Sequence, residues 1–130
     1  MREIEFRGKR KDNGEWVYGD GYCTYIDENE VKHHDIWNGS SWFEVIPETV
    51  GQYIVRKDKR NEKMFSGDIV KNGLSGTWII QPLEDGAFSL LGIDKEHKDS
   101  CYLISALNSK AEVIGNIHDN PELLKGAADE

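Results

Sequence analysis

Two adjacent histidines and an aspartate, His33, His34 and Asp35, form the cluster in this sequence that most resembles a metal site. Zinc is usually held by three or four ligands that come from separated pairs in the sequence. Neighbouring side chains on a strand point to opposite faces, so both histidines cannot reach one ion from regular β-structure. Further ligands would have to come from residues without a metal-binding spacing: His97, Cys101 and His118. We therefore predict no metal and no cofactor, and we interpret the cluster as a polar loop.

Residue types that act as nucleophiles are present, but nothing in the sequence around them indicates activation. Cys23 and Cys101 belong to no catalytic signature. The Gly-Ser-Ser at 39–41 lacks the Gly-x-Ser-x-Gly pattern of a nucleophile elbow. The glycine-rich segment 71–76 lacks the Lys-Ser/Thr of a phosphate-binding loop. Because the chain has 24 Asp and Glu among 130 residues, pairs of carboxylates arise by accident. The sequence predicts no catalytic residues and no enzyme.

Positive charge gathers in two turns. One follows the first strand, and the other spans residues 56–63, where five cations and two acids give a net charge of +3. If the turns are adjacent, their side chains form a patch that could contact nucleic-acid phosphates. The candidate residues are Arg7, Lys9, Arg10, Lys11, Arg56, Lys57, Lys59, Arg60 and Lys63. The alternative, which we favour, is that both are solvated turns whose charges keep them in water.

Aromatic residues provide a second candidate for binding. The chain has four tryptophans and five tyrosines, two residue types that are enriched at protein interfaces. The candidate interface residues are Trp16, Tyr18, Trp42 and Phe43. Trp42 and Phe43 are neighbours in a strand-like segment, so their side chains point to opposite faces and one can stay exposed. We favour a non-enzymatic module that binds protein, either itself or another protein. Nucleic-acid binding through the basic turns is the alternative.

The charge balance is acidic and uneven. The formal charge is −8, of which residues 1–71 carry −2 and residues 72–130 carry −6. An acidic surface repels phosphate backbones unless a local basic patch overrides it. No apolar run approaches the roughly 20 residues of a membrane-spanning helix, and no signal peptide is recognisable at the start. We therefore expect no membrane partner, two reduced thiols and a location in a cytoplasm.

Short extended segments separated by turn residues dominate the sequence. "REIEFRG" alternates apolar and charged residues, and Asn13-Gly14 marks the turn to "EWVYGDGYCTYI", whose glycines suggest a bend. Seven to nine strands are expected, with turn signals at intervals of about ten residues. Near the end, Asn120, Pro121 and Glu122 begin a helix of one or two turns that stops before Gly126. The fold predicted is mainly β, an antiparallel barrel or sandwich with a short C-terminal helix. It forms one domain over residues 1–126, with a frayed tail over 127–130.

Blocks spread over nearly the whole chain resemble the YopX-like proteins of bacteriophages and prophages. The blocks are "MREIEFRGKRKDNGEWVYGD", "TVGQYIVRKDKRNEKMFSGDIVK" and "AEVIGNIHDNPELL". The chain departs from the family pattern around its Lys-Asp, where it has Ile-Val-Arg before and Arg60-Asn61-Glu62 after. The resemblance implies a small, mostly β protein that is encoded by phage or prophage and resides in the bacterial cytoplasm. A protein partner would then be a second copy or a host or phage protein, and the nucleic-acid alternative would be an accessory role in phage DNA metabolism. The resemblance implies no activity and no catalytic residue for this chain.

Overall fold

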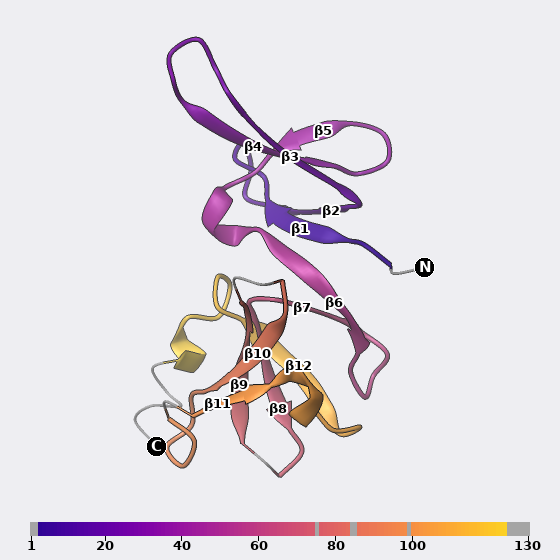
Figure 1. Cartoon of the computed structure of the whole chain (residues 1–130), viewed down its shortest axis with the longest axis vertical. Helices are drawn as coiled ribbons and strands as arrows, with labels where there is room; N and C mark the ends of the chain where they lie inside the picture. The colour runs from indigo at the N-terminus through magenta and orange to yellow at the C-terminus, as the bar shows by residue number, and fades with distance from the viewer. Residues whose placement is uncertain (1–2, 75, 84–85, 99, 125–130) are drawn as a thin grey trace. The chain divides into compact units, whose positions relative to one another are not determined.

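The computed structural model of the protein describes residues 3–74, 76–83, 86–98 and 100–124 (Figure 1). Twelve antiparallel strands and two 3-10 turns lie in this part of the chain, and residues 122–124 are helical. The prediction of a mainly β fold with a short C-terminal helix is therefore confirmed. Every sheet has two edge strands in the described part of the chain, so the barrel alternative is wrong and the arrangement is sandwich-like.

The chain divides into two compact units, Met1–Val55 and Arg56–Glu130. The domain predicted over residues 1–126 thus comprises two units, and the tail predicted over 127–130 lies outside the described residues. Strand β6, Gly51–Lys57, passes from the first unit into the second. Val55, within this strand, has a φ of 62°. A β-branched residue rarely adopts this left-handed conformation, so the backbone is strained where the first unit ends.

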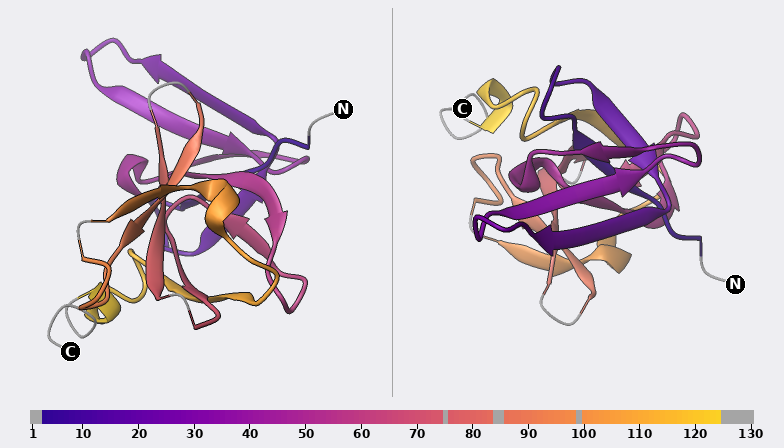
Figure 2. Two further views of the ribbon diagram at one scale, coloured as in Figure 1. Left: turned by 60° about the horizontal axis from the view of Figure 1, so that its bottom comes forward. Right: turned by 90° about the horizontal axis from the view of Figure 1, so that it is seen from above.

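The first unit contains two small sheets. In the first sheet, β1 pairs with β2 and, through its first residues, with β6. The second sheet has the order β3-β4-β5, and its long β3–β4 hairpin is seen along its length in Figure 2. The bounds are Phe6–Lys9 for β1, Trp16–Gly19 for β2, Gly21–Ile26 for β3, Lys32–Trp37 for β4 and Trp42–Glu44 for β5, with a 3-10 turn at Pro47–Thr49. The glycines before and after Asp20 mark the bend at which the chain leaves one sheet for the other.

Apolar side chains from both sheets form the core of the first unit. Val17, Ile36 and Val45 are buried at its centre, with Ile36 fully inaccessible to solvent. Gly8 lies directly above this centre, because a β-carbon there would be 3.1 Å from atoms of Ile36 and Val45. Partly buried hydrophobic side chains pack around the centre: Phe6, Tyr22, Phe43 and Val50.

The second unit is built on a five-stranded sheet of order β11-β10-β9-β8-β12. The bounds are Lys63–Phe65 for β7, Asp68–Asn72 for β8, Thr77–Pro82 for β9, Phe88–Gly92 for β10, Cys101–Leu103 for β11 and Ala111–Asn116 for β12, with a 3-10 turn at Ile104–Ala106. The register places Val70, Trp78, Ile80 and Leu90 on one face, where all four side chains are buried. The segment "CYLISAL" is thus part strand and part 3-10 turn, which explains why its sequence pattern fits both a strand and a helical turn.

The "SGDIV" block forms the turn between β7 and β8. Gly67 has a φ of 92°, which favours glycine because it has no β-carbon. Asp68 is 2% exposed, and its carboxylate accepts a hydrogen bond from the backbone N–H of Phe65 at 2.8 Å. The Gly-Asp pair therefore closes a buried turn, as expected of these residue types.

Candidate protein-interaction surface

One face of the β3-β4-β5 sheet packs on the core, and we call the opposite face the outer face. Strand pairing places Tyr25 beside His33, Cys23 beside Asp35, and Trp37 beside Trp42. Because successive side chains of a strand alternate between faces, Tyr22, Ile36 and Phe43 point to the core instead. The outer face is thus made by seven residues: Cys23, Tyr25, His33, Asp35, Trp37, Trp42 and Glu44. The polar loop predicted at residues 33–35 is wrong, because these residues lie within β4.

Aromatic rings cover part of the outer face. The rings of Trp37 and Trp42 lie 5.5 Å apart at an angle of 51°, and Trp42 is 49% exposed. The Tyr25 ring stacks on the His33 imidazole at 4.9 Å, and Tyr25 is 48% exposed. These rings contact one another while leaving large areas accessible to solvent. Rigid, partly exposed Trp and Tyr side chains are typical of protein interfaces.

His33 is clamped between two carboxylates. Its Nε2 lies 2.7 Å from Asp27 Oδ2, and its Nδ1 lies 2.6 Å from Glu44 Oε2. The hydrogen bond to Asp27, followed by that to Glu44, raises the pKa of His33 above its usual value. The same hydrogen bonds from His33 are the main cause that lowers the pKa of Asp27 and of Glu44. His34 points to the other face, where its Nδ1 lies 2.7 Å from the Tyr22 hydroxyl.

The clamp predicts a defined pH dependence of stability. Because the folded state raises the pKa of His33, its contribution is complete below the unfolded pKa of about 6.5 and is lost as pH rises through the folded pKa. The lowered carboxylate pKa values mean that the contribution is also lost as pH falls below about 4. We expect the stability difference between the wild type and His33→Gln to be largest between these limits. Urea unfolding over a pH series, with NMR titration of the His33 ring, measures both effects. An imidazole midpoint at or below about 6.5 contradicts the clamp.

Asp35 carries a carboxyl oxygen that is buried without a partner. Among the described residues, no donor reaches its Oδ1. Burial raises the pKa of Asp35, and the neighbouring charge of Glu44 raises it further. A desolvated carboxyl without hydrogen bonds is costly, so an unsatisfied one in a native fold requires an explanation. A donor from a bound partner would satisfy this oxygen.

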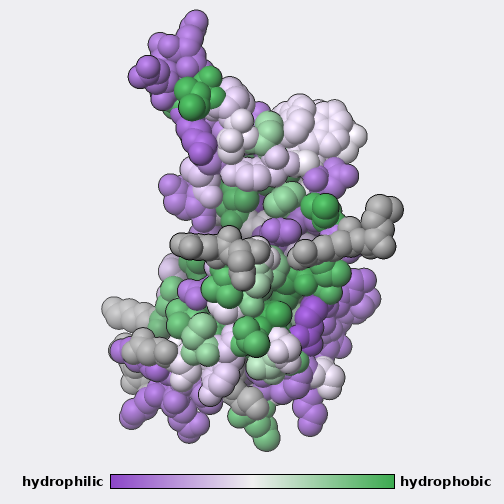
Figure 3. Space-filling model, in the orientation of Figure 1, coloured by the Kyte–Doolittle hydropathy of each residue, from purple (hydrophilic) through white to green (hydrophobic). Residues whose placement is uncertain are grey.

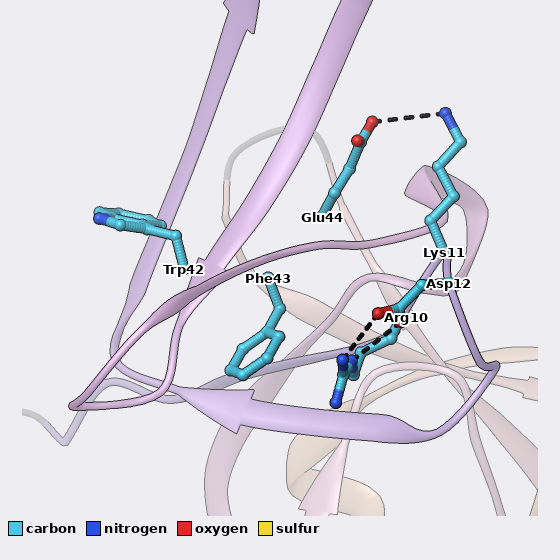
Figure 4. A pocket seen from close by; sticks show the side chains of 6 residues that line it. All are labelled: Arg10, Lys11, Asp12, Trp42, Phe43 and Glu44. Carbon is cyan, nitrogen blue, oxygen red and sulfur yellow. Dashed lines mark hydrogen bonds and ion pairs between the residues drawn. The ribbon is translucent and has the colours of Figure 1, made fainter.

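A pocket of about 490 Å³ adjoins the outer face where the β1–β2 turn meets β5 (Figure 4). Arg10 holds Asp12 through two hydrogen bonds of 2.7 and 3.0 Å, and its guanidinium lies 4.4 Å from the centre of the Phe43 ring. Lys11 pairs with Glu44 at 3.3 Å. Trp42 and Phe43 project to opposite sides of β5, the alternation expected of this segment. The pocket therefore brings together four of the residues that the sequence indicated: Arg10, Lys11, Trp42 and Phe43.

The other indicated residues of the first unit lie on the β1–β2 hairpin. The Arg7 guanidinium lies 4.8 Å from the centre of the Trp16 ring, and the Lys9 ammonium lies 5.4 Å from it. Arg7 is buried, whereas Tyr18 is 46% exposed. These cations are therefore engaged by an aromatic ring of their own hairpin.

The basic turn at 56–63 is held by interactions within the second unit. Asp58 is buried there, and its carboxylate accepts hydrogen bonds from the backbone N–H groups of Arg60, Glu62 and Val113. Arg56 donates to the carbonyl oxygens of Ile104 and Leu107 at 3.0 Å each. Four other cations complete the turn: Lys59 and Arg60 pair with Glu112, Lys57 is exposed, and Lys63 is half-buried. Much of this charge therefore attaches the turn to neighbouring strands.

The sequence did not indicate the clamp, because Asp27, His33 and Glu44 come from three separate segments. The only signal was the Asp-Glu-Asn-Glu turn at 27–30, whose first residue caps the backbone N–H groups of Asn29 and Val31. In the part of the chain that the structure describes, no group of three or more His, Cys, Asp or Glu side chains is placed to hold a metal ion. No helix among the described residues is long and apolar enough to cross a membrane.

The fold and this surface define a small, mainly β protein of two compact units. The family model described as YopX protein matches residues 5–125, so the chain belongs to the YopX family. The crystal structure of protein EF1440 from Enterococcus faecalis is similar at 21% identity and a TM-score of 0.51, covering 95% of this chain and 99% of that one. The crystal structure of YopX from Bacillus subtilis is 19% identical with a TM-score of 0.48, covering 95% and 97%. No curated protein matches the chain. The likeness to EF1440 concerns the fold alone.

Proposed function

We propose that this protein is a phage- or prophage-encoded interaction module that associates with a second copy of itself through strand β3. The proposal rests on one observation, which is that β3 is an exposed edge strand without charged side chains. β3 is an edge of its sheet, since β4 is its one neighbour among the described strands. Its sequence, Gly-Tyr-Cys-Thr-Tyr-Ile, contains no charge, and residues 23–26 are exposed.

An edge strand presents unpaired N–H and C=O groups that can pair with another chain. Native proteins usually protect such edges with lysine, proline, a bulge or a very short strand. β3 is six residues long, pairs regularly with β4 and has none of these protections. Main-chain pairing at an exposed sheet edge is a common mode of protein recognition.

The surroundings of β3 also favour a protein partner. The exposed rings of Tyr25 and Trp42 lie on the outer face of the same sheet, as does the unsatisfied carboxyl of Asp35. Ile26 is 69% exposed at the end of the strand, and Figure 3 shows hydrophobic atoms among hydrophilic ones at the far end of this hairpin. A partner strand beside β3 would shield such groups from water.

Electrostatics restricts where a second copy can bind. The chain carries a formal charge of −8, so two copies repel each other unless their contact avoids the acidic surface. An antiparallel pair of two β3 strands places only uncharged side chains opposite each other. Such a contact has two-fold symmetry, the commonest form of self-association. Nucleic-acid binding is supported less well, because Arg10, Lys11, Lys59 and Arg60 all form ion pairs.

Light scattering coupled to size-exclusion chromatography over a range of concentrations tests this function. We expect a dimer for the wild type. The double variant Thr24→Lys, Ile26→Lys places like charges across the paired strands, so dissociation should become easier by about tenfold or more. Val31→Lys is the matched control, because Val31 is 48% exposed in the same hairpin but lies outside β3.

A monomer at every concentration, or a dimer equally stable in the double variant, contradicts assembly through β3. Retention of such a monomer on DNA at low salt, weakening steeply as salt is added, would support the nucleic-acid alternative instead.

A further inference from the structure

The second unit contains a pocket of about 230 Å³ whose walls are largely aromatic. Trp78 is buried, and its ring meets His97 at 4.9 Å and Tyr102 edge-on at 5.2 Å. Tyr102 is 52% exposed at the mouth, on the edge strand β11. Leu90 lines the pocket from β10, and Asn72 and Asn108 line it from β8 and the segment before β12.

Asp94 holds His97 in one orientation. Its Oδ1 lies 2.7 Å from His97 Nδ1 and also accepts a hydrogen bond from the His97 backbone N–H at 2.8 Å. Its Oδ2 accepts a hydrogen bond from the backbone N–H of Thr77 at 2.6 Å. Burial alone would raise the pKa of Asp94, but these hydrogen bonds lower it, so the carboxylate is ionised at neutral pH. The proton of a neutral His97 therefore resides on Nδ1, and Nε2 is an acceptor.

Two glycines allow the chain to close around this pair. A β-carbon at Gly76 would lie 2.5 Å from His97 Nδ1 and 2.6 Å from Asp94 Oδ2. A β-carbon at Gly92 would lie 2.0 Å from the carbonyl oxygen of His97. Any other residue at these positions would displace the histidine. The backbone is thus fitted to the Asp94–His97 pair, as expected where a side chain must be held in place.

Each amide side chain of the pocket already uses one donor and one acceptor within the protein. Asn72 donates from Nδ2 to the carbonyl oxygen of Ala106, and its Oδ1 accepts the backbone N–H of Asn108. Asn108 donates from Nδ2 to the carbonyl oxygen of Asn72 and accepts the backbone N–H of Lys110. Among the described residues, His97 Nε2 and the Tyr102 hydroxyl have no hydrogen-bond partner. The pocket is therefore preformed, with two polar groups available to a ligand.

We propose that this pocket binds a single nitrogen heteroaromatic ring system, the chemistry of a nucleobase, against Tyr102 and His97. Drug-sized ligands occupy about 300–1,000 Å³, so the smaller volume here suits one ring system. Aromatic walls bind planar rings by stacking. A planar heterocycle suits these aromatic side chains better than a sugar does, because it can stack on them and needs few hydrogen bonds. An edge N–H of the ring donates to His97 Nε2.

A second hollow of about 400 Å³ shares His97 and is lined by two lysines, Lys71 and Lys95, and by two acids, Asp94 and Glu96. Its lysines could bind a phosphate attached to the heterocycle, whereas its carboxylates would oppose one. Comparison of nucleosides with their monophosphates therefore distinguishes the two forms of the ligand. Tighter binding of the monophosphate would assign this hollow to the phosphate, and equal binding would limit the site to the base and its sugar.

Isothermal titration calorimetry with adenosine, guanosine, cytidine and uridine, their 5′-monophosphates and ribose tests the site. We expect saturable binding of at least one nucleoside or monophosphate and none of ribose. Tyr102→Leu keeps an apolar side chain but removes the ring, so binding should weaken by about tenfold or more. Tyr18→Leu is the matched control, since Tyr18 is 46% exposed but lies in the first unit and outside β3.

A second measurement uses the folded wild type alone. In NMR spectra, the bound ligand should shift the His97 ring and Trp78 indole signals and leave the Trp42 indole unchanged. Absence of binding by every probe, equal binding of ribose, or equal weakening by both tyrosine variants would overturn the proposal.

Discussion

Asp58→Ala is expected to lower the free energy of unfolding by about 3 kcal/mol, because three backbone N–H groups lose their acceptor. The Asp58 side chain is fully inaccessible, with 0% exposure. Its Oδ1 accepts the N–H groups of Arg60 and Glu62 at 2.9 Å each, and its Oδ2 accepts that of Val113 at 3.0 Å. One carboxylate therefore closes the turn and joins it to β12. Urea unfolding at neutral pH measures the loss.

Asp58→Asn separates the two roles of this carboxylate. The amide oxygen can still accept from Arg60 and Glu62, but the amide nitrogen then faces the N–H of Val113, so the loss should be intermediate. Burial alone would raise the pKa of Asp58, but the hydrogen bonds from Val113, Glu62 and Arg60 lower it. The stability contribution is thus present above the unfolded pKa of about 4 and is lost as pH falls. Lys57→Ala, at an exposed neighbour, is the control. Equal stability of Asp58→Ala and Lys57→Ala would contradict this role.

Local turn chemistry explains why most strands could be predicted. Asn13-Gly14, Asn38-Gly39 and Gly67 all occupy turns in which glycine has a positive φ. One reason why the strand count was too low is that one continuous segment, 15–26, forms two strands in different sheets. Gly19 causes this separation, since a β-carbon there would lie 1.7 Å from the carbonyl oxygen of Trp37. This close approach involves Trp37 of β4, which is distant in the sequence. Local hydrophobic periodicity therefore gives no information about it.

The candidate surface was predictable only in part, because its chemistry depends on long-range pairing. Alternation along β5 correctly separated an exposed Trp42 from a half-buried Phe43. The partner of His33, Glu44, follows from the register of β4 against β5. Likewise, Asp58 looks like one acid among cations in the sequence, and its structural role requires Val113, 55 residues later. Charge counting identifies a basic turn but not the partners that neutralise it.

Ile36→Ala is expected to destabilise the first unit by about 2–5 kcal/mol. The Ile36 side chain is 0% exposed and forms the centre of the core with Val17 and Val45. Its truncation removes apolar contacts and leaves a cavity between strands of two sheets, which the surrounding residues cannot fill without moving β4. Gly8, where a β-carbon would lie 3.1 Å from Ile36, has no side chain with which to fill it. Ile4→Ala is the matched control, because the same substitution in the same unit acts on a side chain that is 52% exposed and lies outside β3, so it should change stability by less than about 0.5 kcal/mol. Chemical denaturation with hydrogen exchange of amides in residues 3–55 measures both variants, and similar losses for the two isoleucines would contradict the core assigned to this unit.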